Sequence, residues 1–74
     1  MNAIRIHPYV DMLRVDDFVR LDPDMKADIL KSVEKEGCVV VTYPEETNLY
    51  VKGIPRQLYF VMYNLLTTYD IELI

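Results

Sequence analysis

Residues 21–37 read LDPDMKADILKSVEKEG and carry the clearest secondary-structure signal in the chain. Asp22 is suited to the N-cap position, and Pro23 suits the first helical position because its missing N–H would have no helical partner there. Gly37 is a natural left-handed stop. At about 100° per residue, one side of the helix collects the apolar residues Met25, Ile29, Leu30 and Val33, and the other collects Asp24, Asp28, Lys31, Ser32 and Lys35. The stretch predicts a helix with one buried face.

The sequence around this helix contains four strand signals. Residues 3–7, AIRIH, alternate apolar and polar side chains and end at Pro8. Residues 38–43, CVVVTY, form a β-branched run typical of a buried strand. The polar loop 44–48 is of hairpin length, so LYVKG at 49–53 is predicted to return as its partner, and DIELI at 70–74 alternates again.

Residues 9–21 do not give a single interpretation. Val10, Leu13, Phe18 and Leu21 fit a short helix, and they also fit a second extended segment that runs into a turn near Asp16 and Asp17. We leave both open and favour a helical turn at 16–20.

The last helix is predicted to follow Gly53, Ile54 and Pro55. Its core-facing sector, about 140° wide on the same helical wheel, contains Leu58, Val61, Met62, Leu65, Leu66 and Tyr69. The resulting order, β-α-β-β-α-β over residues 1–74, predicts one α+β domain with a ferredoxin-like split βαβ sandwich. We expect a four-stranded antiparallel sheet with both helices on one face. Such a fold hosts many unrelated functions.

The same helix carries more aromatic side chains than its core sector needs. Tyr59, Phe60 and Tyr63 lie outside that sector, close to Arg56. One interpretation is that the tyrosines lean over the sheet with their hydroxyl groups in water. The other is an interface, because interfaces favour Tyr, Phe and Arg. We predict an interface at Tyr59, Phe60, Tyr63 and Arg56, with a homodimer as the commonest arrangement and another protein as the alternative partner.

Composition and charge restrict the remaining function classes. The formal net charge of −4 has the wrong sign for neutralising phosphates, so we expect no direct nucleic-acid binding. No apolar segment approaches the ~20 residues of a membrane span, and the first residues lack the features of a signal peptide. Cys38 is the only cysteine, which rules out an internal disulfide. We therefore expect a cytoplasmic protein that does not bind membranes.

The chain has few side chains suited to catalysis or to metal binding. His7 is the only histidine, and no second His or Cys stands at metal-ligand spacing. Cys38 opens a predicted buried strand, where a thiol behaves as a small hydrophobe. The carboxylate pairs Asp16–Asp17 and Glu45–Glu46 are typical of solvated turns. We expect no enzyme activity, no metal and no cofactor.

One speculative ligand site lies at the start of the last helix. Lys52, Gly53 and Arg56 surround backbone N–H groups that attract anions. Ile54, in the capping position, has no side chain that accepts a hydrogen bond from them. An anion or a partner's carboxylate is the ligand this arrangement predicts.

Three function classes follow from these features. The first is a small non-catalytic interaction or regulatory domain, homodimeric, that binds through the aromatic face of its last helix or through a sheet edge. The second is a compact acidic inhibitor, of the kind that mobile elements encode, of a host enzyme or a nucleic-acid-handling complex. The third is a sensor of a small anionic ligand that uses Lys52 and Arg56. The poor catalytic inventory favours the first.

Overall fold

The computed structural model describes residues 3–74, and it begins with a hairpin. Strand β1, Ile4–Pro8, pairs antiparallel with β2, Met12–Val15, with Ile6 opposite Val15. The Tyr9 amide donates to the Met12 carbonyl at 2.8 Å and closes the turn. Of the two interpretations of residues 9–21, the extended one is therefore correct for 12–15. The helical turn that we favoured at 16–20 is present in shorter form, as the 3₁₀ helix η1, Phe18–Arg20.

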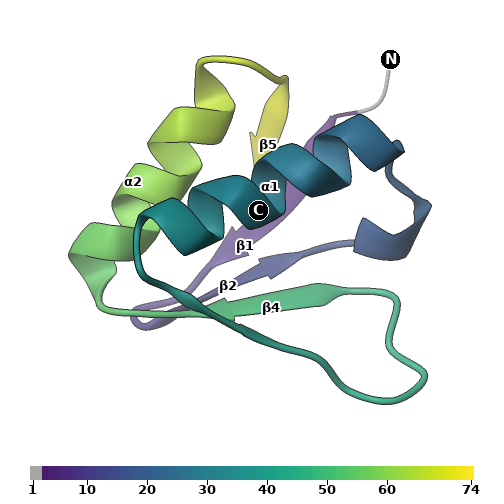
Figure 1. Cartoon of the computed structure of the whole chain (residues 1–74), viewed down its shortest axis with the longest axis horizontal. Coiled ribbons are helices and arrows are strands. Elements are labelled where there is room, and N and C mark those ends of the chain that lie inside the picture. Colours follow the sequence, from purple (N-terminus) through teal and green to yellow (C-terminus); the bar gives the residue numbers. More distant parts are fainter. Residues whose placement is uncertain (1–2) are drawn as a thin grey trace.

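The sheet has five strands in the order β3-β4-β2-β1-β5 (Figure 1). Strands β3 (Val39–Val41) and β4 (Leu49–Lys52) pair antiparallel, as β4 does with β2, whereas β5 (Ile71–Leu73) runs parallel to β1. The α+β class is confirmed, whereas the four-stranded antiparallel sheet and the β-α-β-β-α-β order of a ferredoxin-like sandwich are wrong, since two strands precede α1. The reason is β2, which lies between β1 and β4 and reverses the chain after β1.

Both helices, α1 (Pro23–Lys35) and α2 (Pro55–Leu66), lie on the same face of the sheet (Figure 1). Alternate strand residues point toward them, so Ile6 and Val51 are fully buried while Arg5 and Lys52 are exposed. We call the side of the sheet without helices the open face. The buried apolar core comprises Ile4, Ile6, Leu13, Val15, Ile29, Val33, Leu49, Val51, Leu58, Val61 and Leu65.

The buried stripe of each helix differs from the predicted one. Leu30 of α1 and Leu66 of α2 are 42% and 48% exposed, whereas Ser32, expected on the polar side, is buried. The cause is contact between the helices, because Asn64 of α2 donates to the Ser32 hydroxyl at 3.1 Å. The prediction considered burial of α1 against the sheet alone. Because α2 also packs against α1, the buried stripe of α1 is rotated toward α2.

Strand β3 is not the buried strand that its valines suggested. It lies at one end of the sheet, pairs with β4, and leaves Val39 61% exposed. A β-branched run does not by itself distinguish a central strand from an edge strand, because both are pleated in the same way. At the end of α1 the prediction is confirmed, since Gly37 adopts the left-handed φ of 77° after Lys35.

Candidate functional site

The exposed side of α2 is aromatic. Tyr59, Phe60 and Tyr63 are 58%, 38% and 52% exposed, and we call these three residues the aromatic surface. The Tyr59 ring stacks on Tyr63 with centroids 6.4 Å apart and meets Phe60 edge to face at 5.5 Å. Because Tyr59 contacts both of the other rings, these contacts fix the ring positions and form a pre-organised apolar platform. The structure thus brings together the three aromatic residues of the predicted interface.

Two further residues of α2 extend this platform. Leu66 lies on the same exposed side, although the sequence placed it in the core. Arg56 is the only charged residue of Pro55–Leu66, and its side chain forms no hydrogen bond or ion pair within residues 3–74. The exposed side of α2 therefore combines half-exposed rings, a leucine and a single cation.

An apolar groove borders the aromatic surface. It has a volume of about 600 Å³ and lies between the β1–β2 turn and the first half of α2. Tyr9 and Val10 of the turn, 50% and 81% exposed, form one wall, and Tyr59, Arg56 and Met62 line the other. The sequence did not point to Tyr9 and Val10, because their position depends on the hairpin. The turn and the helix together form a continuous apolar region.

The residues of the predicted anion site point in different directions. Lys52 lies on the open face of the sheet, opposite Met12 and Val39, whereas Arg56 lines the groove beside α2. The backbone N–H of Ile54 already donates to the Gln57 side chain at 3.2 Å. Gly53 packs closely against Cys38, whose Sγ atom lies 2.9 Å from the place a Cβ would take. The anion site remains a prediction that this geometry does not strengthen.

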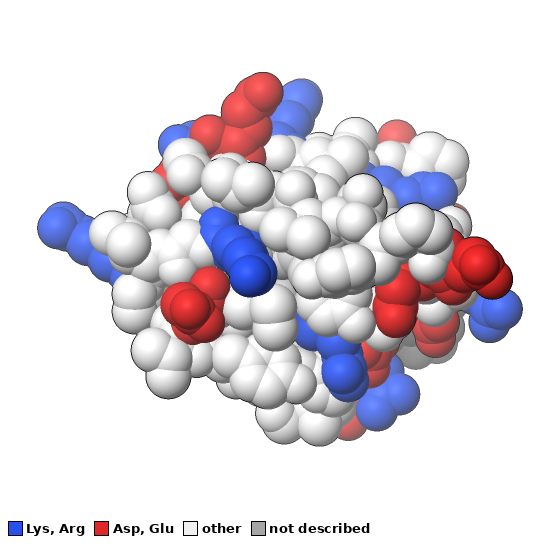
Figure 2. All heavy atoms as spheres, turned by 90° about the horizontal axis from the view of Figure 1, so that it is seen from below, with Lys and Arg blue, Asp and Glu red and all other residues white. Residues whose placement is uncertain are grey.

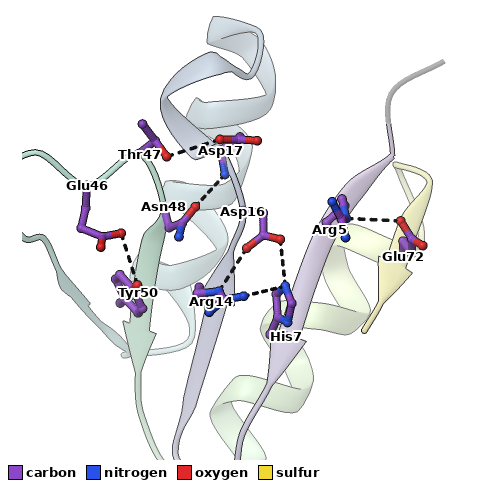
Figure 3. A network of polar contacts seen from close by, with 10 residues as sticks. All are labelled: Arg5, His7, Arg14, Asp16, Asp17, Glu46, Thr47, Asn48, Tyr50 and Glu72. Atoms are coloured by element: carbon purple, nitrogen blue, oxygen red, sulfur yellow. Dashed lines mark hydrogen bonds and ion pairs between the residues drawn. The ribbon is translucent and has the colours of Figure 1, made fainter.

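The open face carries a polar cluster of His7, Arg14 and Asp16 (Figure 3). Arg14 Nε donates to Asp16 Oδ1 at 3.0 Å, and His7 Nε2 lies 2.8 Å from Asp16 Oδ2 and 3.0 Å from Arg14 Nη2. Burial raises the pKa of the Asp16 carboxyl, but the hydrogen bonds and charges of His7 and Arg14 outweigh burial and hold this pKa below its usual value. Sequence reasoning missed the cluster and treated Asp16 as a solvated carboxylate.

The chemistry of this cluster is that of an internally neutralised ion network. A single ring nitrogen of His7 cannot donate to Asp16 and accept from Arg14 at the same time, so its bond depends on which nitrogen carries the proton. The Arg14–Asp16 pair does not depend on that choice. Because the only side-chain partners of His7 among residues 3–74, in either tautomer, are Asp16 and Arg14, we assign the cluster a role in joining β1 to β2 and the turn that follows.

We expect Asp16→Asn to lower the free energy of unfolding at pH 7 by about 1 kcal/mol, since a charge-assisted hydrogen bond is lost. The folded-state pKa of Asp16 lies below the unfolded one, so its contribution exists above the unfolded value and disappears as the pH falls through the folded value. The free energies of unfolding of the two chains, measured by urea denaturation, should therefore differ at pH 7 and converge at a pH well below the ordinary carboxyl value of 3.8. Asp11→Asn, at an exposed carboxylate, is the control. An equal loss at both pH values would contradict this role.

Other candidate side chains have structural roles. Burial, together with the nearby Glu36 charge, raises the pKa of the Cys38 thiol, which disfavours a reactive thiolate. Tyr69, predicted to face the core, packs against the core cluster and also donates its hydroxyl to Asp28 of α1, and this bond raises the pKa of Tyr69. Asp17 and Glu46 accept hydrogen bonds from Thr47 and Tyr50 around the β3–β4 loop (Figure 3).

Charge on the surface is mixed in sign. Viewed from below, Lys and Arg atoms alternate with Asp and Glu atoms around a largely uncharged area (Figure 2). Over residues 3–74, no cluster of three or more His, Cys, Asp or Glu side chains is arranged to hold a metal ion. No helix in that range has the length and apolar character needed to span a membrane.

Comparison with known protein families, with curated protein sequences and with solved structures gives no match. The candidate site therefore rests on the geometry of this chain alone. Among its features, the aromatic surface of α2 and the adjoining groove form an exposed apolar region outside the buried core.

Proposed function

We propose that this protein is a small non-catalytic interaction domain that docks another polypeptide on the aromatic surface of α2. One observation carries the proposal: three aromatic side chains, joined by the contacts of Tyr59 with the other two, remain 38–58% exposed on one helix. Exposed apolar residues that are scattered singly need no explanation, but a contiguous patch bordered by polar residues is typical of protein–protein contact.

The packing of the core also supports this proposal. Leu58, Val61 and Leu65 already fill the space between α2 and the sheet, so the aromatic residues are not needed to complete it. A small domain gains little stability from exposed rings, which also carry a risk of aggregation. Docking gives these residues a physical role.

The compact acidic inhibitor is a weaker alternative. An inhibitor that works by charge needs a concentrated acidic surface, whereas both signs are interspersed on the face that Figure 2 shows. Complexes held by charge weaken as salt screens them, and apolar docking on rings does not. Binding that is retained at 1 M salt therefore favours the aromatic surface.

Photo-crosslinking at single positions tests the proposal. A benzophenone side chain replaces Tyr63 in one variant and Tyr43 in the other, because both residues are about half exposed and each contacts another ring. Irradiated in cells, the position-63 chain is expected to form one dominant adduct with a polypeptide, and the position-43 chain is expected to form none. Equal labelling from both positions, or no adduct from position 63, would contradict the proposal.

A further inference from the structure

We infer that the polypeptide docked on the aromatic surface is a second copy of this chain, with the two α2 helices packed antiparallel about a two-fold axis. This inference rests on the proposed function and names its partner. Three features of the described residues carry it: the area of the exposed apolar region, its near absence of charge, and the position of Arg56.

The area matches the requirement of a dimer. Aromatic residues bury about 150–250 Å² when fully covered, so the exposed parts of Tyr9, Tyr59, Phe60 and Tyr63, with Val10 and Leu66, amount to roughly 500 Å². A standard interface takes about 800 Å² from each partner, of which about 60% is apolar. One copy therefore offers the apolar area that its side of such an interface needs.

The charge distribution allows a second copy to dock on α2. Two copies of a chain with net charge −4 repel each other over most of their surfaces. The exposed side of α2 carries no acidic residue, whereas α1 exposes Asp24 and Lys31 among others. Two copies can therefore approach along α2 without bringing like acidic charges together.

Arg56 selects the antiparallel orientation. It lies in the first turn of α2, where its charge opposes the positive end of the helix dipole, while the last turn contains no basic residue. In a parallel pair, Arg56 would meet Arg56 of the other copy. An antiparallel pair centred near Val61 instead places Arg56 beside Leu66 of the other copy, at the negative end of that helix. It also places Tyr59 against Tyr63 of the other copy.

A charge reversal separates this arrangement from a purely structural role of Arg56. Arg56→Glu is expected to raise the dimer dissociation constant roughly tenfold, because both symmetry-related cations are replaced. In the Phe60→Asp background, which keeps the chains monomeric, the same change is expected to raise Tm by about 2–6 °C, since Glu suits the first turn. A residue that only supports the monomer would not move the two quantities in opposite directions.

Sedimentation equilibrium of the 74-residue chain tests the inference. The wild-type protein is expected at twice its chain mass of 8.7 kDa, and the Arg56→Glu dimer is expected to dissociate at higher protein concentration than the wild-type dimer. Val39→Glu, on edge strand β3 opposite Lys52, is expected to leave the dimer unchanged. A monomeric wild-type protein, an unaltered Arg56→Glu dimer, or a dimer lost in Val39→Glu would overturn the inference. A monomer that still forms a position-63 adduct with a different protein overturns only this inference, whereas no adduct overturns the proposed function as well.

Discussion

Ile6→Ala is expected to lower the free energy of unfolding by about 2–5 kcal/mol, a large part of the few kcal/mol that a domain of this size possesses. Ile6 is fully buried on β1, between β2 and β5, and its side chain joins the core cluster beneath the helices. Removal of its outer carbon atoms leaves a cavity that the surrounding side chains of the core cluster cannot all move to fill.

The measurement is urea denaturation followed by circular dichroism, at one protein concentration for all chains. Val19→Ala is the control, because Val19 is half exposed on η1 and its truncation should change the free energy by less than about 0.5 kcal/mol. If Ile6→Ala cost no more than Val19→Ala, β1 would not lie inside the sheet as described.

The strand that contains Ile6 was predictable, but its neighbours were not. Alternation in AIRIH indicates β1 directly, since each second side chain faces the core. Strand β2 has only four residues, and Leu13 and Val15 are its only buried ones, so the pattern is too short to separate a strand from a helical turn. Because this strand was missed, the predicted order of elements was wrong, and β5 was expected in an all-antiparallel sheet although it runs parallel to β1.

The residues of the candidate site were likewise predictable only in part. Tyr59, Phe60, Tyr63 and Arg56 follow from helical periodicity alone, and the structure places all four on the exposed side of α2 or in the adjoining groove. Tyr9 and Val10, in contrast, join the apolar region only because the hairpin brings them to the first half of α2. The polar cluster of His7 and Arg14 also depends on strand register, which a local pattern does not contain.

Phe60→Asp is expected to raise the dimer dissociation constant by about a thousandfold or more. Each copy loses a central aromatic contact of hot-spot size, about 2 kcal/mol or more, and symmetry counts the loss twice. In the antiparallel arrangement centred near Val61, the two new carboxylates also lie close to the two-fold axis and repel each other. Phe60 is 38% exposed in the monomer, so the monomer itself should keep its fold.

Size-exclusion chromatography with light scattering checks this result, and circular dichroism confirms that the variant remains folded. Tyr43→Asp is the matched control, because Tyr43 is a half-exposed aromatic residue that contacts another ring but lies away from α2. A folded Phe60→Asp chain that still elutes as a dimer would show that association uses another surface.

Contact between the two α2 helices is the central claim, and isotope-filtered NOE spectroscopy on a mixture of labelled and unlabelled chains tests it most directly. The account predicts intermolecular NOEs between the ring protons of Tyr59 in one copy and those of Tyr63 in the other. At a chain concentration of about 0.5 mM, any dimer with a dissociation constant below about 0.1 mM is mostly formed. The account would be contradicted by intermolecular NOEs confined to Val39 and the β3 edge, or by the absence of intermolecular NOEs at this concentration.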